Sequence, residues 1–303
     1  MPIRIPDDLP ARRVLENEGI AVMDSTRAAR QDIRPLQIGL LNLMPNKQRT
    51  ETQFARLIGS TPLQVDVTLV RITDHLSKNT PQEYLDTFYQ TWEDVRSRKF
   101  DGFIVTGAPI ANIPFEEVRY WQEMVEIMDW TQTNVHHTMF ICWGAQAALH
   151  HFHGVRRYRM PHKAFGVYRH KVVNTRAPYL RGFSDDLAVP VSRYNDIDRS
   201  SLPEDLEILI DSAEVGICML DDPRHRAVHM LNHFEYDHTS LAEEYERDIG
   251  AGMTIDPPVD LFPNNDPTQV PENRWRSHAF LLFQNWINEI YQTTHYDLDQ
   301  IGS

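Results

Sequence analysis

Cysteine is scarce in this chain, and long apolar runs are missing from it. Only Cys142 and Cys218 occur among the 303 residues, which argues against a fold built on disulfides. Since thiols stay reduced in the cytoplasm, we expect a cytoplasmic protein. No apolar run approaches the roughly 18 residues that a membrane span requires. The opening residues MPIRIPDDLP carry prolines and acids where a secretory signal needs apolar residues.

Basic residues are outnumbered by acidic ones. Lysine and arginine total 30, aspartate and glutamate total 43, and the formal net charge is -13. This charge argues against nonspecific binding to nucleic acid or to an anionic membrane, because both select basic surfaces. It leaves room for an anionic small molecule that is held by a few local cations. The remaining composition, 41% hydrophobic and 24% charged, is typical of a soluble globular protein.

Short apolar runs alternate with amphipathic segments through the first half of the chain. Such runs are typical of buried parallel strands, and the segments between them have helical spacing. The alternation predicts an α/β fold, with a mostly parallel sheet covered by helices on both faces. The predicted strands are residues 36–43, 63–72, 100–109 and 136–144, and the predicted helices are 50–60, one or two after 81, 118–134 and one from 145.

The second half is less regular and predicts extra antiparallel strands. Strand-like runs occur at 165–173, 189–194, 206–212, 215–220 and 227–233, and helices are expected over 239–252 and 277–292. In the first of these helices, Ser240 and Glu243 have the spacing of a capping box. Residues 1–34 mix proline, arginine and acids, so we expect an N-terminal arm there and a single domain over 35–303.

Cys142 lies in the stretch FICWGAQAAL, where the fourth predicted strand meets a helix. Open α/β sheets bind their ligands at this edge. A sharp strand-to-helix turn exposes a nucleophile, and the helix N-terminus favours a thiolate and offers N–H groups to an oxyanion. Gly144 is expected to supply the conformational freedom of the turn. The alternative is a buried core cysteine, which is our interpretation of Cys218.

A nucleophilic cysteine needs a base, and the chain has 14 histidines. His233 and Glu235 in NHFEYD follow an apolar strand directly and are two residues apart. In an extended segment both side chains point the same way, so the carboxylate can hold one ring nitrogen while the other faces the thiol. A surface His–Glu pair is the alternative. The clusters HHT and LHHFHGV suggest a metal only weakly, because no H-E-x-x-H helix or cysteine pair accompanies them, and we expect no metal.

Nearly the whole chain resembles the homoserine O-acyltransferase family of methionine biosynthesis. The resemblance is carried, in order, by LLNLMPNKQRTETQFARLIG, PLQVDVTLVRI, FDGFIVTGAP, FICWGAQAAL, NHFEYD and WRSHAFLLFQNWINEIYQ. It implies a flavodoxin-like fold similar to class I glutamine amidotransferases. It also implies transfer of an acetyl or succinyl group from coenzyme A to the hydroxyl of L-homoserine through an acyl-cysteine. Acyl-CoA is then a co-substrate, no resident cofactor is expected, and a homodimer is left open.

The resemblance assigns roles by matching motif. It makes Cys142 the nucleophile, His233 the general base, Glu235 its partner, Lys163 and Ser192 substrate contacts, and Arg247 the ligand of the amino-acid carboxylate. Two further candidates could support the oxyanion: the backbone N–H of Trp143 at the start of the helix, and Lys47 at the end of the first strand. For the phosphates of coenzyme A, the candidates are Lys47, Arg49 and the stretch RRYRMPHK, although RRYR is also typical of a solvated charge run.

Ala111 departs from the pattern of the family. Acetyl-specific members carry glutamate at this position, and succinyl-specific members carry glycine. A carboxylate there fills the acyl pocket and repels the succinyl carboxylate. Alanine does neither, so the residue favours succinyl-CoA, while acetyl-CoA stays open.

Without the resemblance, two other classes fit the same residues. A glutamine amidotransferase or cysteine hydrolase uses such a triad and would release ammonia from glutamine. A binding module with Cys142 in its core would leave this thiol unreactive toward iodoacetamide.

Overall fold

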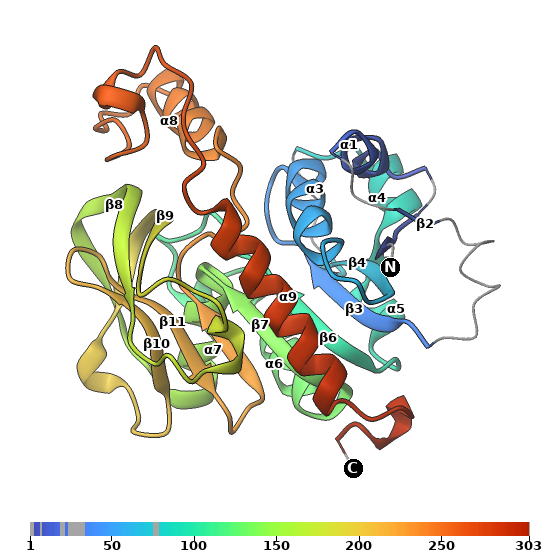
Figure 1. Cartoon of the computed structure of the whole chain (residues 1–303). Coiled ribbons are helices and arrows are strands. Elements are labelled where there is room, and N and C mark those ends of the chain that lie inside the picture. The colour runs from blue at the N-terminus through green and yellow to red at the C-terminus, as the bar shows by residue number, and fades with distance from the viewer. Residues whose placement is uncertain (1–2, 7, 19–21, 24–33, 75–78, 303) are drawn as a thin grey trace.

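The computed structural model describes residues 3–6, 8–18, 22–23, 34–74 and 79–302. Their strands form one twelve-stranded mixed sheet, in the order β2-β1-β4-β3-β6-β7-β12-β11-β10-β8-β9, with β5 paired to β4. The parallel strands occupy one side of the molecule, and β8 to β11 gather on the other (Figure 1).

The parallel half confirms the predicted α/β architecture. Its main strands are β3 (Leu36–Leu41), β4 (Val65–Arg71), β6 (Phe100–Val105), β7 (Val135–Ile141) and β12 (Ala227–Met230). All neighbouring pairs among these strands are parallel. Each of the four predicted strands is present, and all four end earlier than the apolar pattern suggested. Irregular segments follow the first three, and the turn at Cys142 and the first residues of α7 follow the fourth.

Helices cover both faces of this sheet. One core contains Ile38 and Leu40 of β3, and the other contains Leu41 of the same strand. Because successive side chains of a strand point to opposite faces, a strand buried on both sides needs a continuous apolar run. The first core includes residues of α1 (Ala11–Asn17), α3 (Lys47–Ile58) and α9 (Arg276–Thr293), and the second includes residues of α5 (Trp92–Val95), α6 (Trp121–Asn134) and α7 (Trp143–His153). Figure 1 shows α9 crossing in front of β6 and β7.

The beginning of the chain extends this sheet. Strand β1 (Ile3–Arg4) lies between β2 (Val22–Met23) and β4 and is parallel to both. Leu9 and Leu15 are buried in the core beside α3. The division into an arm and a domain stays a prediction, but these residues pack as part of the same body. Further along, α4 (Gln82–Phe88) is followed by β5 (Gln90–Thr91).

The second half adds antiparallel strands to the edge of the parallel sheet, as predicted, but the strand expected among them at 227–233 is β12, which pairs in parallel with β7. The antiparallel strands are β8 (Arg157–Val172), β9 (Asp186–Ile197), β10 (Glu207–Ser212) and β11 (Gly216–Asp222), and β11 pairs with β12. Short 3-10 helices lie at Phe115–Glu117, Pro178–Leu180, Arg199–Ser201, Pro263–Asn265 and Leu298–Gln300. No helix among the described residues has both the length and the apolar character needed to cross a bilayer.

The predicted capping box at the start of α8 (Ser240–Gly250) is wrong. The N-cap residue is Thr239, whose side chain makes no capping bond, and Ser240 is already the first helical residue. Ser240 and Glu243 instead bond to side chains of α3. The Ser240 hydroxyl accepts from Gln53 at 3.0 Å, and Glu243 pairs with Arg49.

The buried carboxylate of Asp222, far from the start of α7, lies among three histidines. Asp222 Oδ2 lies 2.6 Å from His153 Nε2, 2.9 Å from His225 Nδ1 and 3.4 Å from His229 Nε2. Ligand atoms of His153, Asp222 and His225 lie within 4.8 Å of one another, a spacing that could hold a metal ion. The hydrogen bonds satisfy the carboxylate without one, and the expectation of no metal stays a prediction.

This cluster should make the protein sensitive to acid. Burial alone would raise the pKa of Asp222, but hydrogen bonds and charge from His153 and His229 hold it well below the ordinary 3.8, while burial lowers the pKa of His229 below 6.5. In both cases the unfolded state binds protons first as the pH falls, so stability is lost below about pH 6.5 for the imidazole and below about pH 4 for the carboxylate. We expect Asp222→Asn to lower Tm at pH 7 by several degrees and to remove the carboxylate's own loss of stability below about pH 4.

Melting curves between about pH 3 and about pH 7, a range that spans both ordinary pKa values, test this expectation. Asp211→Asn is a suitable control because Asp211 forms an ion pair with the exposed Arg199 instead of binding buried histidines. An Asp222→Asn protein as stable as the parent at every pH would contradict it.

Candidate active site

Cys142 stands alone between β7 and α7, in a backbone conformation that few residues adopt. Its φ is 51° and its ψ is -113°. The Cys142 amide donates to the Met230 carbonyl of β12 at 2.7 Å, and its carbonyl accepts from Gln146 at 3.0 Å. These bonds fix a strained residue at the turn, as in a nucleophile elbow. The thiol is partly exposed, whereas Cys218 is fully buried in β11, as predicted for a core cysteine.

Gly144 does not supply the freedom of this turn. It lies inside α7, and Cys142 itself takes the positive φ. A Cβ on Gly144 would stand 2.8 Å from the Thr106 carbonyl oxygen and 3.0 Å from that of Val105. Glycine therefore lets α7 begin directly against the end of β6. Similarly, a Cβ on Gly107 would stand 3.0 Å from Cys142 Cβ, so glycine keeps space beside the thiol.

His233 and Glu235 form the predicted pair. His233 Nδ1 lies 2.7 Å from Glu235 Oε1, and both side chains are buried. The segment follows β12, whose neighbour β7 carries Cys142. The His233 amide donates to the Pro190 carbonyl at 3.1 Å, and the Tyr236 ring stacks on the imidazole at 4.1 Å between centroids. Since Nδ1 is held by the carboxylate, Nε2 is left for other partners.

The pKa of His233 depends on its interaction with Cys142. Burial alone would lower the pKa of His233, but the charge of a Cys142 thiolate and of Glu235, with a hydrogen bond to each, raises it well above 6.5. This direction favours an imidazolium beside the Cys142 sulfur. An imidazolium next to the sulfur is what a nucleophilic cysteine needs.

A cavity of about 250 Å³ opens over the thiol. Seven of the residues singled out from the sequence line it, namely Ala111, Cys142, Trp143, Lys163, Ser192, His233 and Arg247. Glu235 lies behind His233 and is not among the lining residues. Side chains from distant parts of the chain thus meet at one site.

Lys47 lies apart from this group. Its ammonium donates to the Asn42 carbonyl at 2.5 Å, and it lines a neighbouring cavity of about 190 Å³ with Met44 and Pro109. Burial lowers its pKa to about 8, with Glu51 opposing the change. Its support of an oxyanion stays a prediction.

The sequence did not single out two carboxylates of α8 that organise the cavity. Glu244 Oε1 accepts from Lys163 Nζ and from Ser192 Oγ, each at 2.7 Å. Asp248 Oδ1 accepts from Arg247 at 2.6 and 2.8 Å. The signal was present, because positions 244 and 248 are four apart on a predicted helix and so share a face. The result is a polar wall with both charge signs opposite the thiol.

Buried polar contacts hold the segment before His233. Arg193 donates to Asn232 Oδ1 and to the carbonyls of Ile217 and Val215. Asn232 in turn lies 2.9 Å from His170 Nε2. This network ties β9 and β11 to the end of β12 and fixes the backbone from which His233 projects.

Comparisons with known proteins agree over the full length. The family model described as homoserine O-succinyltransferase matches residues 2–296. A protein of Pelagibacterium halotolerans named homoserine O-succinyltransferase is 78% identical over 303 residues, covering 100% of this chain and 99% of the relative. Proteins named homoserine O-acetyltransferase are 61% identical in Chelativorans sp. and 59% in Brucella canis, both over 304 residues, covering 100% of this chain and 97% and 99% of those relatives.

Solved structures share the architecture at much lower identity. A glutamine amidotransferase from Thermotoga maritima has a TM-score of 0.56 and 13% identity, covering 86% of this chain and 100% of that one. A glutamine amido transferase from Methylobacillus flagellatus has a TM-score of 0.54 and 13% identity, with 88% and 99% covered. These likenesses concern the fold alone, and they confirm the fold that was predicted.

Proposed function

The chain belongs to the homoserine O-succinyltransferase family and is a homoserine O-acyltransferase, and we propose that Cys142 carries the acyl group and that succinyl-CoA is the donor. The observation that supports the role of Cys142 most directly is its coupling to the His233–Glu235 pair beneath a cavity of small-molecule size. A core cysteine would have neither the strained turn nor the charged partner.

The first half-reaction forms the acyl-enzyme. The Cys142 thiolate attacks the thioester carbonyl carbon of the acyl-CoA. The N–H groups of Trp143 and of residues 107–108, which line the cavity, would stabilise the oxyanion. The bond to the coenzyme A sulfur then breaks, and the departing thiolate takes the proton of the His233 imidazolium. Glu235 keeps the Nδ1 proton in place, so that Nε2 is the atom that exchanges protons.

The second half-reaction passes the acyl group to homoserine. Neutral His233 removes the hydroxyl proton, the oxygen attacks the acyl-cysteine, and Cys142 leaves as a thiolate beside the restored imidazolium. Homoserine is a zwitterion, and the cavity offers both signs of charge. Arg247 suits its carboxylate, and Glu244 and Asp248 are the acids that suit its ammonium. Lys163 and Ser192 would hold Glu244 in position.

Two observations favour succinyl-CoA over acetyl-CoA. Ala111 lines the cavity and brings no carboxylate to repel the negative end of a succinyl group. The relative that is 78% identical bears the succinyltransferase name, while those named acetyltransferase are at 61 and 59%.

Ala111→Glu should therefore reverse the choice of donor. Two like charges near 4 Å repel by roughly 1–4 kcal/mol in water or at a protein surface, which corresponds to about fivefold to nearly a thousandfold in rate. We expect kcat/KM of the parent protein to be higher with succinyl-CoA, and the succinyl-to-acetyl ratio to fall by about 100-fold in the variant.

Ala111→Gln separates charge from size, because glutamine has nearly the volume of glutamate without its charge. The succinyl-to-acetyl ratio of this variant should lie between those of the parent protein and Ala111→Glu. Steady-state kinetics with both donors and L-homoserine measure the ratio for all three proteins. If the parent protein prefers acetyl-CoA, succinyl-CoA is not the donor. If it transfers neither group to homoserine, the proposed function is wrong.

A further inference from the structure

The proposed donor is strongly anionic at its nucleotide end, and this chain has a net charge of -13. General attraction between the two is therefore absent, and recognition must come from particular cations near the mouth of the cavity. Guanidinium groups suit phosphate best, because their donors match its oxygens in pairs.

Several cations around the cavity are already engaged with acids. Such pairs are Lys163 with Glu244, Arg247 with Asp248, and Arg49 with Glu243. A phosphate would have to compete with a carboxylate for each of them. Arg49, a candidate from the sequence, is thereby a poor choice.

Arg157 and Arg159 differ from these cations. Neither lies within ion-pair distance of a carboxylate in the described part of the chain. Arg159 donates to the Asn112 side chain, and its guanidinium lies 4.8 Å from the Tyr194 ring centroid. Arg157 donates to the Ile113 carbonyl and lies 3.8 Å from the Phe115 ring centroid. All these partners are neutral. Burial lowers the pKa of Arg157 and the charge of Glu116 opposes this change, so Arg159 is the less compensated of the two positive charges.

Their position connects them to the reactive sulfur. Asn112 and Tyr194, the two contacts of Arg159, also line the cavity over Cys142. Arg159 pairs in register with Asn195, another lining residue. An acyl-CoA with its carbonyl at the thiol would pass between the loop that carries Asn112 and strand β9, and its phosphates would emerge beside the two arginines.

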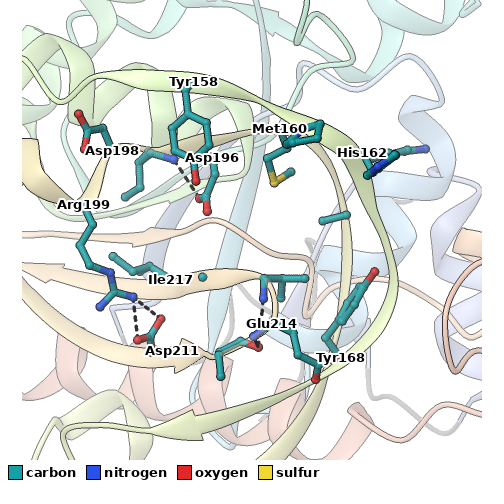
Figure 2. Close-up of a pocket in the computed structure, with 18 residues that line it drawn as sticks. Tyr158, Met160, His162, Tyr168, Asp196, Asp198, Arg199, Asp211, Glu214 and Ile217 are labelled. Carbon is teal, nitrogen blue, oxygen red and sulfur yellow. Dashed lines mark hydrogen bonds and ion pairs between the residues drawn. The ribbon is translucent and has the colours of Figure 1, made fainter.

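Tyr158, which lies between Arg157 and Arg159, points to the opposite face of the strand, because successive side chains of a strand alternate. Tyr158 lines a second cavity of about 900 Å³, which is bounded by Asp196, Asp211 and Glu214 and shares only Lys163 with the lining of the cavity over Cys142 (Figure 2). That cavity is rich in acids and contains neither Cys142 nor the two arginines. Arg157 and Arg159 therefore face the active-site side of β8, away from the acidic cavity.

We propose that Arg159, assisted by Arg157, binds the phosphate groups of the acyl-CoA nucleotide at the mouth of the Cys142 cavity. This inference rests on the proposed function, since it concerns the donor of that reaction. The aromatic rings under the two guanidinium groups preorganise them, and the exposed Arg159 presents donor hydrogens to phosphate oxygens.

A donor without phosphates provides the test. Succinyl-pantetheine presents the same thioester and the same chain to Cys142 but lacks the nucleotide. Arg159→Gln should raise KM for succinyl-CoA by about tenfold or more, as expected for the loss of a charge-assisted hydrogen bond. It should leave the kinetic constants for succinyl-pantetheine unchanged. Arg157→Gln together with Arg159→Gln should raise KM for succinyl-CoA further.

Arg156→Gln is the matched control, because Arg156 is exposed, immediately precedes the same strand and forms an ion pair with Asp198. This variant should leave KM for succinyl-CoA and for succinyl-pantetheine unchanged. An equal loss with both donors in Arg159→Gln would show a structural role and overturn the inference, as would an unchanged KM for succinyl-CoA. A parent protein that used neither thioester would instead overturn the proposed function, and this inference with it.

Discussion

Cys142→Ala is expected to lower kcat by about 10⁴-fold or more, because loss of the nucleophile in a covalent mechanism costs on the order of 10⁴ to 10⁶. The variant should also form no acyl adduct when it is mixed with succinyl-CoA alone, whereas the parent protein should gain one succinyl group on the peptide that contains Cys142. Intact-mass and peptide mass spectrometry measure the adduct, and steady-state assays measure the turnover.

Cys218→Ala is the natural control, since it removes the other cysteine of the chain. Cys218 is fully buried, and burial raises the pKa of its thiol to about 12, so it should neither react with iodoacetamide nor carry an acyl group. Its replacement should affect stability more than turnover. Retained activity in Cys142→Ala, or an adduct on any other residue, would contradict the acyl-cysteine mechanism.

The position of Cys142 was predictable because local pattern determines it. An apolar run followed at once by helix-forming residues predicts that Cys142 lies at the carboxyl edge of a parallel sheet, and β7 and α7 confirm this. The pattern could not say which residue bears the strain of the turn. Gly144 was expected to do so, but the positive φ belongs to Cys142, because the fit of α7 against β6 is a tertiary constraint.

The polar wall of the cavity was less predictable. Lys163 and Glu244 are 81 positions apart, and nothing local in either segment indicates the other. Likewise, α8 lacks the capping box that its sequence suggests because Ser240 and Glu243 have partners on α3. Short-range patterns identify strands, helices and the elbow, whereas long-range pairing decides which side chains face the thiol.

His233→Gln is expected to lower kcat by about 10³- to 10⁴-fold, the contribution of a general acid–base residue near the upper end of its usual range. Glutamine cannot exchange protons with coenzyme A or with homoserine, and it provides no positive charge beside the thiolate. The loss should appear in both half-reactions, which single-turnover measurements of acyl-enzyme formation and breakdown can separate.

Glu235→Gln should act through the same imidazole. Burial lowers the pKa of His233, while Cys142 and Glu235 raise it, so removal of the carboxylate should lower that pKa. The imidazolium is then lost at a lower pH, and the thiolate–imidazolium pair is populated over a narrower range. The rate of alkylation of Cys142 by iodoacetamide, measured against pH, should fall near neutrality.

Asp237→Asn is the control for this variant, since Asp237 belongs to the same segment but bonds Arg56 and Gln53 instead of His233. Its alkylation profile should match that of the parent protein. If Glu235→Gln left both the profile and kcat unchanged, the carboxylate would be a mere packing partner. The coupling of Cys142, His233 and Glu235 into one proton-transfer unit would then have to be abandoned.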